Sequence, residues 1–184
     1  MGGILMKRWF SIVLILIGII CCFVAVYPIF HIREGVNESL EKWEDTGHDR
    51  GNLEDGMIGV LQINGDEKLI PIHIGTGDEV LNQGVGLDEL TVYPGDKGNS
   101  VLYGHRENIL WGLKDVKIGD LITIENLDTI LVFEVKDTQV VDPYDSYIYE
   151  KTQQPTITLV TCYPFIYMGP TPQRFVVRAE LKEN

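Results

Sequence analysis

MIGVLQINGDEKLIPIHI, residues 57–74, decides the fold class of this chain. Two apolar runs of strand length, 57–63 and 68–74, flank the polar turn Asn64-Gly65-Asp66. An Asn-Gly pair tolerates the positive φ angles of tight hairpin turns, and apolar runs around it are a strong hairpin signal. We therefore predict that the domain begins with a β-hairpin.

Five more strand-length runs follow, rich in β-branched and aromatic residues and separated by polar turns. They are SVLYGH (100–105), LITIENL (121–127), TILVFEVKDTQVV (129–141), TITLVTC (156–162) and RFVVRAEL (174–181). Short helices are expected only at 79–83 and 108–113. Strands outnumber helices and no repeat is visible, so residues 56–184 are predicted to form one all-β domain, an antiparallel barrel or sandwich.

An uncharged apolar segment, WFSIVLILIGIICCFVAVYPIF (9–30), precedes this domain. About 20 apolar residues are enough for a helix to cross the hydrocarbon layer of a membrane. Lys7 and Arg8 precede the segment, so we expect residues 1–8 in the cytoplasm and the chain after residue 31 outside the cell. A cleaved signal peptide is the alternative, but its apolar region usually spans only about 7–15 residues. A single-pass protein of the cell membrane is the better interpretation.

Residues 31–55 are polar and are interpreted as an extracellular linker. Within it, Val36, Leu40 and Trp43 have the spacing of one helix face, which predicts a short amphipathic helix resting on the domain. A glycine-containing connector would then lead to the first strand.

Composition excludes several classes of function. The formal charge is −12, from 15 basic and 27 acidic residues, so no basic surface is expected for nucleic acid. Three cysteines, two of them inside the apolar segment, cannot form a disulfide framework. No CxxC, HxxxH, HExxH, P-loop or GxGxxG pattern occurs, so we expect neither a metal site nor another cofactor. The acidic residues within 142–150 are interpreted as a solvated loop rather than a calcium site.

Cys162 is the only cysteine outside the apolar segment, and it ends a predicted strand. A strand end can present a nucleophile to a cleft, but a lone cysteine is also commonly buried and inert; position alone leaves both open. A nucleophilic thiol needs a proton partner. His105 is the best placed histidine because it ends a short strand and opens a polar turn. The others lie beside the membrane (His31), in the linker (His48) and within a strand run (His73).

Two arginines lie on the last predicted strand, four residues apart and therefore on one face. Arg174 is nearer to the loop end where Cys162 is expected, and its planar charged group suits a carbonyl oxygen that develops negative charge. Arg178 is farther along the strand. For both, pairing with one of the many acidic residues at the surface is the alternative.

Three segments of the chain resemble a known family, in the same order. TLVTCYPF (158–165) is similar to the TLxTC signature of sortases, with the Tyr-Pro-Phe continuation of their class D branch. PQRFVV (172–177) resembles the strand that holds the sortase arginine, and YGHR (103–106) the segment that holds the sortase histidine. The resemblance covers about residues 56–182, and the apolar anchor agrees with it.

The resemblance implies an eight-stranded sortase β-barrel and a cysteine transpeptidase. Carried over to matching positions, Cys162 would be the nucleophile, His105 the general acid and base, and Arg174 the group that stabilises substrate and oxyanion. Arg178 falls outside the motif and is interpreted as structural.

The substrates implied by the resemblance are secreted proteins with an LPxTG-type C-terminal signal, cut between Thr and Gly. An amine of a peptidoglycan precursor or a pilin lysine would then resolve the thioacyl-enzyme. Thr161 and Tyr163 flank the cysteine, and Val141 and Pro143 begin the loop that precedes its strand. We expect these four residues to bind the sorting signal.

Two other functions compete with this one. A wall-modifying cysteine hydrolase or L,D-transpeptidase is disfavoured, because His105 precedes Cys162 and no SHGC-type motif surrounds the cysteine. A membrane-tethered, non-catalytic β-module that binds wall or partner proteins would explain the all-β pattern with Cys162 as a core residue. Alkylation separates these cases, because a core cysteine resists it in the folded state.

Overall fold

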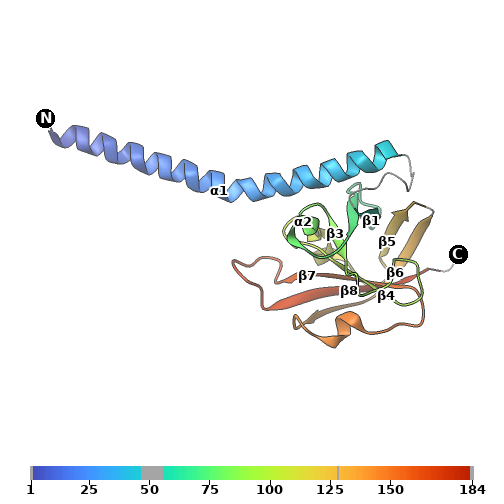
Figure 1. Ribbon diagram of the computed structural model, residues 1–184. Coiled ribbons are helices and arrows are strands. Elements are labelled where there is room, and N and C mark those ends of the chain that lie inside the picture. Colours follow the sequence, from blue (N-terminus) through green and yellow to red (C-terminus); the bar gives the residue numbers. More distant parts are fainter. Residues whose placement is uncertain (1, 47–55, 128, 183–184) are drawn as a thin grey trace.

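Eight strands close into a barrel beside one long N-terminal helix (Figure 1). The computed structural model describes residues 2–46, 56–127 and 129–182. The strands are β1 (Met57–Ile63), β2 (Ile70–Ile74), β3 (Val85–Leu87), β4 (Asn99–Tyr103), β5 (Leu121–Asn126), β6 (Ile130–Val141), β7 (Thr156–Tyr163) and β8 (Gln173–Leu181). Around the barrel their order is β1-β2-β3-β4-β7-β8-β6-β5.

The predicted N-terminal hairpin is confirmed, because β1 and β2 pair antiparallel around the Asn-Gly turn. Asn64 and Gly65 have φ angles of 53° and 68°, the left-handed conformation that this dipeptide tolerates. The Asn64 side chain donates to Asp120 Oδ2 at 2.8 Å and accepts from the Leu121 N–H at 3.1 Å. The turn is therefore fixed against the start of β5.

The prediction of a purely antiparallel sheet is wrong. The pairs β2–β3 and β4–β7 are parallel, and the remaining neighbours are antiparallel. Parallel pairs require crossover connections, which here contain α2 (Asp78–Leu81) between β2 and β3 and two 3-10 helices, η2 (Trp111–Asp115) and η3 (Ser146–Tyr149), between β4 and β7. The first two helices lie close to the predicted positions 79–83 and 108–113.

The barrel core explains the apolar runs. Its largest fully buried side chains include Leu61, Ile72, Leu102 and Phe133, each contributed by a different strand. Burying one such side chain contributes about 1.5–3 kcal/mol. On β7, residues 156–161 are all buried, because this strand has neighbours on both sides and its two faces are covered. The stretch is not apolar throughout: the buried threonines Thr156, Thr158 and Thr161 donate their hydroxyls to Gln154, Asn99 and Gly104, so no buried polar group is left without a partner there.

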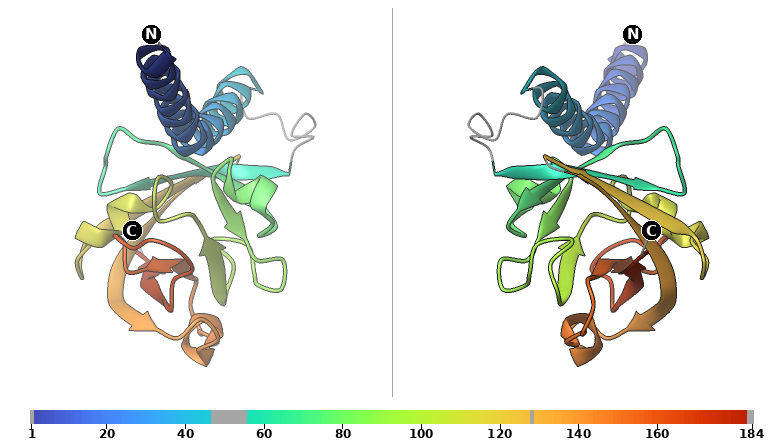
Figure 2. Two further views of the ribbon diagram at one scale, coloured as in Figure 1. Left: turned by 90° about the vertical axis from the view of Figure 1, so that its left-hand side faces the viewer. Right: turned by 90° about the vertical axis from the view of Figure 1, so that its right-hand side faces the viewer.

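The long helix α1 (Gly2–Thr46) has two halves with different surroundings. The second half lies along the barrel beside β1 (Figure 2). There Ile32 and Val36 pack on the main core, and Trp43, 6% exposed, packs with Met57 and Val60 of β1. The predicted amphipathic helix is thus continuous with the apolar segment instead of separate, and its connector at 47–55 lies outside the described residues.

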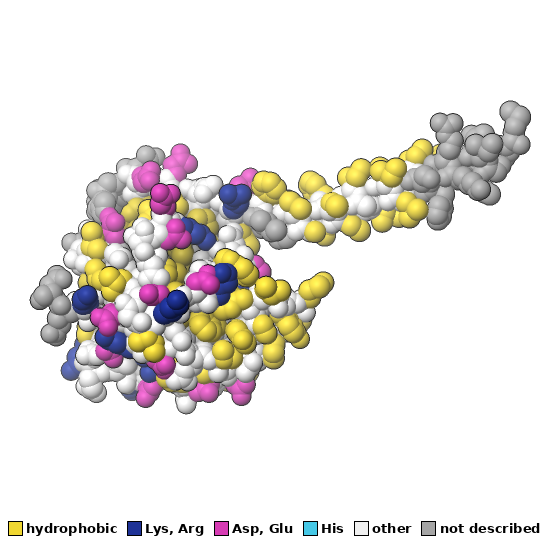
Figure 3. All heavy atoms as spheres, turned by 180° about the vertical axis from the view of Figure 1, so that it is seen from behind, with side chains coloured by type: hydrophobic (Ala, Val, Ile, Leu, Met, Phe, Trp, Pro, Cys, Tyr) yellow, Lys and Arg dark blue, Asp and Glu magenta, His cyan; other side chains and the backbone are white. Residues whose placement is uncertain are grey.

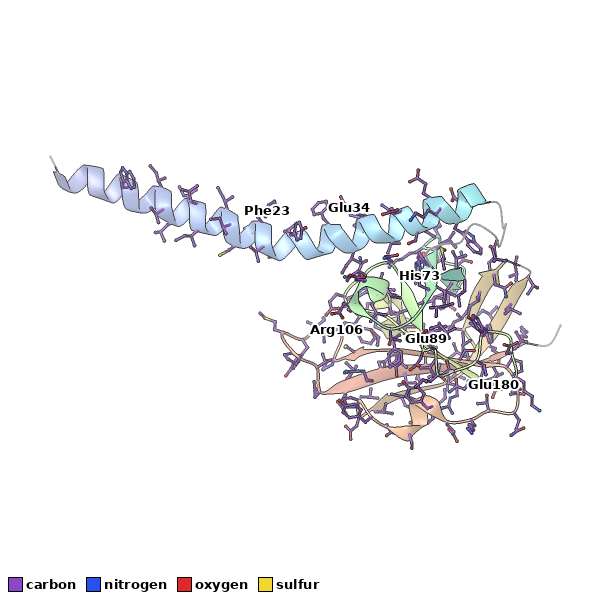
Figure 4. The ribbon with its side chains drawn as sticks, viewed as in Figure 1. Phe23, Glu34, His73, Glu89, Arg106 and Glu180 are labelled. Atoms are coloured by element: carbon purple, nitrogen blue, oxygen red, sulfur yellow. The ribbon has the colours of Figure 1, made fainter. Side chains whose placement is uncertain are left out.

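The first half of α1 extends away from the barrel with exposed apolar side chains (Figures 1 and 3). It includes a stretch long and apolar enough to cross a membrane. The helix bends between Phe23 and Glu34 (Figure 4), where Pro28 supplies no backbone N–H to the helical ladder.

Candidate active site

Three neighbouring strands bring Cys162, Arg174 and His105 to one end of the barrel. Cys162 on β7 lies directly opposite Arg174 on β8 in the antiparallel ladder, so the two side chains share a face. Strand β4 runs parallel to β7 with Tyr103 beside Val160. His105 follows two residues after the end of β4. Although Cys162 and His105 are separated by 57 positions in the sequence, the parallel pairing of β4 with β7 brings them to the same end of the barrel.

The backbone that leads to His105 is held on both sides. The Gly104 N–H donates to the Val160 carbonyl at 3.2 Å, and the Thr161 hydroxyl donates to the Gly104 carbonyl at 2.7 Å. A Cβ on Gly104 would lie 2.8 Å from the side chain of Leu110, so only glycine fits. The His105 carbonyl in turn accepts from the Leu110 N–H at 2.9 Å. These contacts fix the His105 backbone relative to β7.

Arg174 keeps most of its hydrogen-bonding capacity available. One guanidinium nitrogen, Nη1, donates to the Gln173 carbonyl at 3.0 Å and to Thr171 Oγ1 at 3.3 Å. No carboxylate within the described residues forms an ion pair with it. A partly buried guanidinium without an acidic partner can bind an external carbonyl oxygen. The alternative of a surface ion pair therefore does not apply to Arg174 as it lies here.

A chain of tyrosines lies beside this arginine. The hydroxyls of Tyr103 and Tyr149 are 2.8 Å apart, and Tyr149 donates to Asp88 Oδ2 at 2.6 Å. Burial raises the pKa of Tyr103, while its bond with Tyr149 and the charge of Arg174 oppose that rise. Burial and the bond to Asp88 likewise raise the pKa of Tyr149. Both tyrosines therefore stay protonated near neutral pH and act as neutral hydrogen-bond donors.

Arg106, which was not predicted from the sequence, stabilises the turn that follows Cys162 by hydrogen bonds to its backbone. Its buried guanidinium donates to the carbonyls of Pro164 at 2.9 Å and Tyr167 at 2.8 Å, and its Nε forms an ion pair with Glu107 at 2.8 Å. The residue after His105 thus fixes the turn after Cys162. The only available signal was its place beside His105 in YGHR.

We predict that Arg106→Leu loosens this turn and lowers the free energy of unfolding by about 3 kcal/mol, because two carbonyls lose a charged donor. Denaturant titration measures the loss, and hydrogen exchange should become faster at the amides of residues 165–168. Glu107→Gln is the matched control: it removes only the ion pair to an exposed carboxylate and should cost less than about 1 kcal/mol. Equal losses for the two variants would contradict the assignment.

The residues expected to bind substrate occupy two different environments. Tyr163 is half-buried and belongs to an aromatic cluster with Phe165 and Phe175, at ring distances of 6.2 and 6.3 Å. Pro143 is half-exposed at the start of the β6–β7 loop. Thr161 is 2% exposed with its hydroxyl bound to Gly104, and Val141 is 7% exposed in a core cluster. The side chains of Thr161 and Val141 are therefore buried. They can affect a bound substrate only indirectly, by supporting the backbone around the site.

The β6–β7 loop is held by a network around Tyr147 on η3. The Tyr147 hydroxyl donates to Asp137 Oδ2 at 2.6 Å, and the Arg178 guanidinium lies 3.9 Å from the centre of the Tyr147 ring. Arg178 also forms an ion pair with Glu150 at 2.8 Å. Burial and the bond to Asp137 raise the pKa of Tyr147 to about 12, and the same bond lowers the pKa of Asp137. These contacts agree with a structural role for Arg178.

The Tyr147–Asp137 bond should make stability depend on pH. Because the pKa of Asp137 is lower in the folded state, its contribution is present above the ordinary pKa of 3.8 and is lost as pH falls through the folded value. We expect Tyr147→Phe to cost about 1–2 kcal/mol at neutral pH, and the difference from wild type to shrink as the pH falls below 3.8. Urea titrations across this range measure it. The exposed Tyr144→Phe should have no effect, and a pH-independent cost of Tyr147→Phe would contradict the prediction.

Of the other three histidines, two lie in described elements other than β4, β7 and β8. His73 on β2 is 2% exposed and is separated from β7 by β3 and β4 (Figure 4). His31 belongs to α1, and His48 lies outside the described residues. Among the residues that the structure describes, no three His, Cys, Asp or Glu side chains are grouped to hold a metal ion.

Comparison with known proteins matches this chain to one family. The family model described as the sortase domain covers residues 61–182. Sortase D of Bacillus subtilis is 32% identical over 123 residues, which are 66% of this chain and 61% of that protein. The matched stretch thus spans less than two thirds of that relative.

Solved structures show the same fold. A Clostridium perfringens Sortase D5 transpeptidase superposes with a TM-score of 0.70 over 82% of this chain and 99% of that one, at 23% identity. Streptococcus pneumoniae Sortase C superposes with a TM-score of 0.64 over 70% of this chain and 68% of that one, at 28% identity. The eight-stranded barrel, the motif segments on β4, β7 and β8 and the match over residues 61–182 agree, and this chain belongs to the sortase family.

Proposed function

We propose that this chain is a membrane-anchored cysteine transpeptidase that joins secreted proteins carrying an LPxTG-type signal to an amine. The observation that supports this most is the sheet register, with Cys162 opposite Arg174 and His105 at the end of the strand on the other side of β7. A thiol, an imidazole and a guanidinium thereby lie at one end of the barrel, and these groups can serve as nucleophile, proton carrier and charged donor.

In the first half-reaction, His105 takes the thiol proton and Cys162 Sγ attacks the threonine carbonyl carbon of the signal. The carbonyl oxygen becomes an oxyanion, which the Arg174 guanidinium stabilises. Collapse of this intermediate breaks the Thr–Gly bond, His105 gives its proton to the departing amine, and a thioester remains.

In the second half-reaction an amine attacks the thioester. His105 removes the proton of the attacking nitrogen and returns it to the Cys162 sulfur as the new amide forms. The acceptor is an amine of a peptidoglycan precursor or a pilin lysine. Pilin lysines belong among the acceptors to be tested, since the pneumococcal sortase C structure is described in terms of pilin substrate specificity.

The proposed location follows from α1. Residues 9–30 would span the membrane, with 1–8 in the cytoplasm because of Lys7 and Arg8 and the catalytic domain 56–184 outside. The second half of α1 packs on the barrel through Trp43, so the part of 31–55 that the structure describes belongs to the fold. The anchor would place the site where secreted proteins and wall precursors leave the membrane.

The test uses the full chain in detergent, with Cys21→Ser and Cys22→Ser so that Cys162 is the sole thiol. A panel of LPxTG-type peptides is mixed with oligoglycine, a lysine peptide or hydroxylamine, and products are identified by mass spectrometry. Peptide cut after threonine and joined to the amine supports the proposal. Absence of product with every peptide, together with a Cys162 that is alkylated only after unfolding, would favour the non-catalytic β-module.

A further inference from the structure

The turn between β7 and β8 presents an apolar tip to the surroundings. Ile166 is 87% exposed, Met168 is 98% exposed, and Tyr167 between them is 47% exposed. Single exposed apolar residues are ordinary on a protein surface, whereas a cluster of them at a projecting tip indicates a binding surface.

The base of this turn is rigid. The Arg106 guanidinium binds the carbonyls of Pro164 and Tyr167, and the ring of Phe165 packs 5.3 Å from that of Phe175 and 6.1 Å from that of Trp111. The ring of Phe165 therefore faces the protein while its neighbours Ile166 and Met168 face outward. The turn cannot bury its tip by collapsing without breaking these contacts.

The turn also lacks charge in an otherwise acidic protein. No Asp, Glu, Lys or Arg occurs from residue 152 to residue 173, although the chain as a whole has a formal charge of −12. Moving a charged side chain out of water into a lipid interface is costly. This uncharged stretch can approach a membrane without that cost.

The direction in which the β7–β8 turn projects indicates that its binding partner is the membrane. In Figure 1 the β7–β8 turn projects from the barrel on the same side as the apolar half of α1, and in Figure 3 apolar side chains gather at that edge beneath the helix. The orientation of α1 on the barrel is fixed by Val36 and Trp43, which pack into the domain. A membrane spanned by the first half of α1 therefore faces the tip of the turn.

We propose that Ile166, Tyr167 and Met168 insert into the interfacial layer of the membrane that α1 spans. Transfer of isoleucine and methionine side chains from water into the interfacial layer is favourable, and a tyrosine ring is favoured at the level of the lipid headgroups. The domain then has two attachments to the bilayer, the helix and the turn. Because Cys162 immediately precedes the turn, these two attachments fix the height of the β7 end above the lipid. This inference rests on the α1 anchor and not on the chemistry proposed above.

The test places an environment-sensitive NBD fluorophore on the tip of the full chain. Met168→Cys is combined with Cys21→Ser, Cys22→Ser and Cys162→Ala, labelled, and reconstituted into phosphatidylcholine–phosphatidylglycerol vesicles. Ile166→Cys provides a second position on the tip. Ile130→Cys is the matched control, since Ile130 is 62% exposed but begins β6, whose other end, at Val141, pairs with Arg174 beside the turn.

If the tip inserts into the membrane, the emission of NBD at positions 166 and 168 should shift to shorter wavelength and should be quenched by doxyl groups attached to the lipids. NBD at position 130 should instead be quenched by iodide in the aqueous phase. Iodide quenching at all three positions would overturn the proposal. A shift at 166 and 168 that appears only after a sorting-signal peptide with an apolar tail is added would also overturn it, because the tip would then bind polypeptide instead of lipid. No enzymatic turnover enters this readout, so its failure is distinct from failure of the proposed reaction.

Discussion

Replacement of Cys162 by Ala is expected to abolish both the cutting of the sorting peptide and the formation of a thioester. The methyl group cannot attack a carbonyl, and removal of the nucleophile from a catalytic set of this kind lowers turnover by at least about a thousandfold. Intact-mass spectrometry after mixing with peptide alone detects the thioester, and product assays with an amine measure transfer.

The expected effect is chemical and not structural. The Cys162 side chain is half-buried at a strand end, and alanine keeps the backbone pairing with Arg174. Cys162→Ala should therefore unfold at nearly the temperature of the wild type. The matched control is the Cys21→Ser, Cys22→Ser protein, which should keep full activity because both cysteines lie on the exposed apolar half of α1. Transfer above background by folded Cys162→Ala would remove Cys162 from the mechanism.

Local patterns were sufficient to predict most of the barrel. Residues 57–74 predicted a hairpin, and its Asn-Gly turn has the positive φ angles on which that prediction depended. The runs at 121–127 and 129–141 became the adjacent antiparallel pair β5 and β6. In each case the strand signal and the turn signal lie within a few residues of each other, so no information about distant parts of the chain was needed.

Long-range pairing could not be predicted in the same way. Strand β3 has three residues, one of them Gly86, and is too short to show periodicity. It exists because Ile72 to Ile74 on one side and Leu102 and Tyr103 on the other supply backbone partners. The parallel pairing of β4 with β7 depends on a connection of more than fifty residues. No short window of sequence contains that information.

The residues of the candidate site likewise differ in whether they could be predicted from local sequence. Cys162, His105 and Arg174 were selected by motif, and the barrel register then placed all three at one end. The buried Arg106 was not selected, because its function is defined by two backbone carbonyls about sixty positions away. Every residue type has a backbone carbonyl, so the side chains at the two accepting positions do not indicate that an arginine binds there. The only guide in the sequence was the neighbouring histidine.

The second large effect is expected from the two arginines of β8. Arg174→Ala should reduce transfer by about a hundred- to a thousandfold, which is the usual cost of removing one donor to a developing oxyanion. Arg178→Ala should cost far less activity, because Arg178 can affect a bound peptide only through the β6–β7 loop that it supports. The four-residue separation places Arg178 about 13 Å farther along the strand, opposite Thr158 instead of Cys162.

The same two variants should differ in the opposite sense in stability. Arg178 holds Glu150, the Tyr147 carbonyl and the Tyr147 ring, so its loss should lower the free energy of unfolding by about 2–3 kcal/mol. Within the described part of the chain, the Arg174 side chain bonds to its near neighbours Gln173 and Thr171, so alanine there should be nearly neutral for folding. Turnover rates and denaturant titrations on both proteins give four numbers. Equal losses of rate would mean that the Cys162–Arg174 register does not define the oxyanion donor, whereas equal losses of stability would contradict the structural role given to Arg178. The expected result is that Arg174→Ala loses turnover rate and Arg178→Ala loses stability. One arginine of β8 would then act in catalysis and the other in folding.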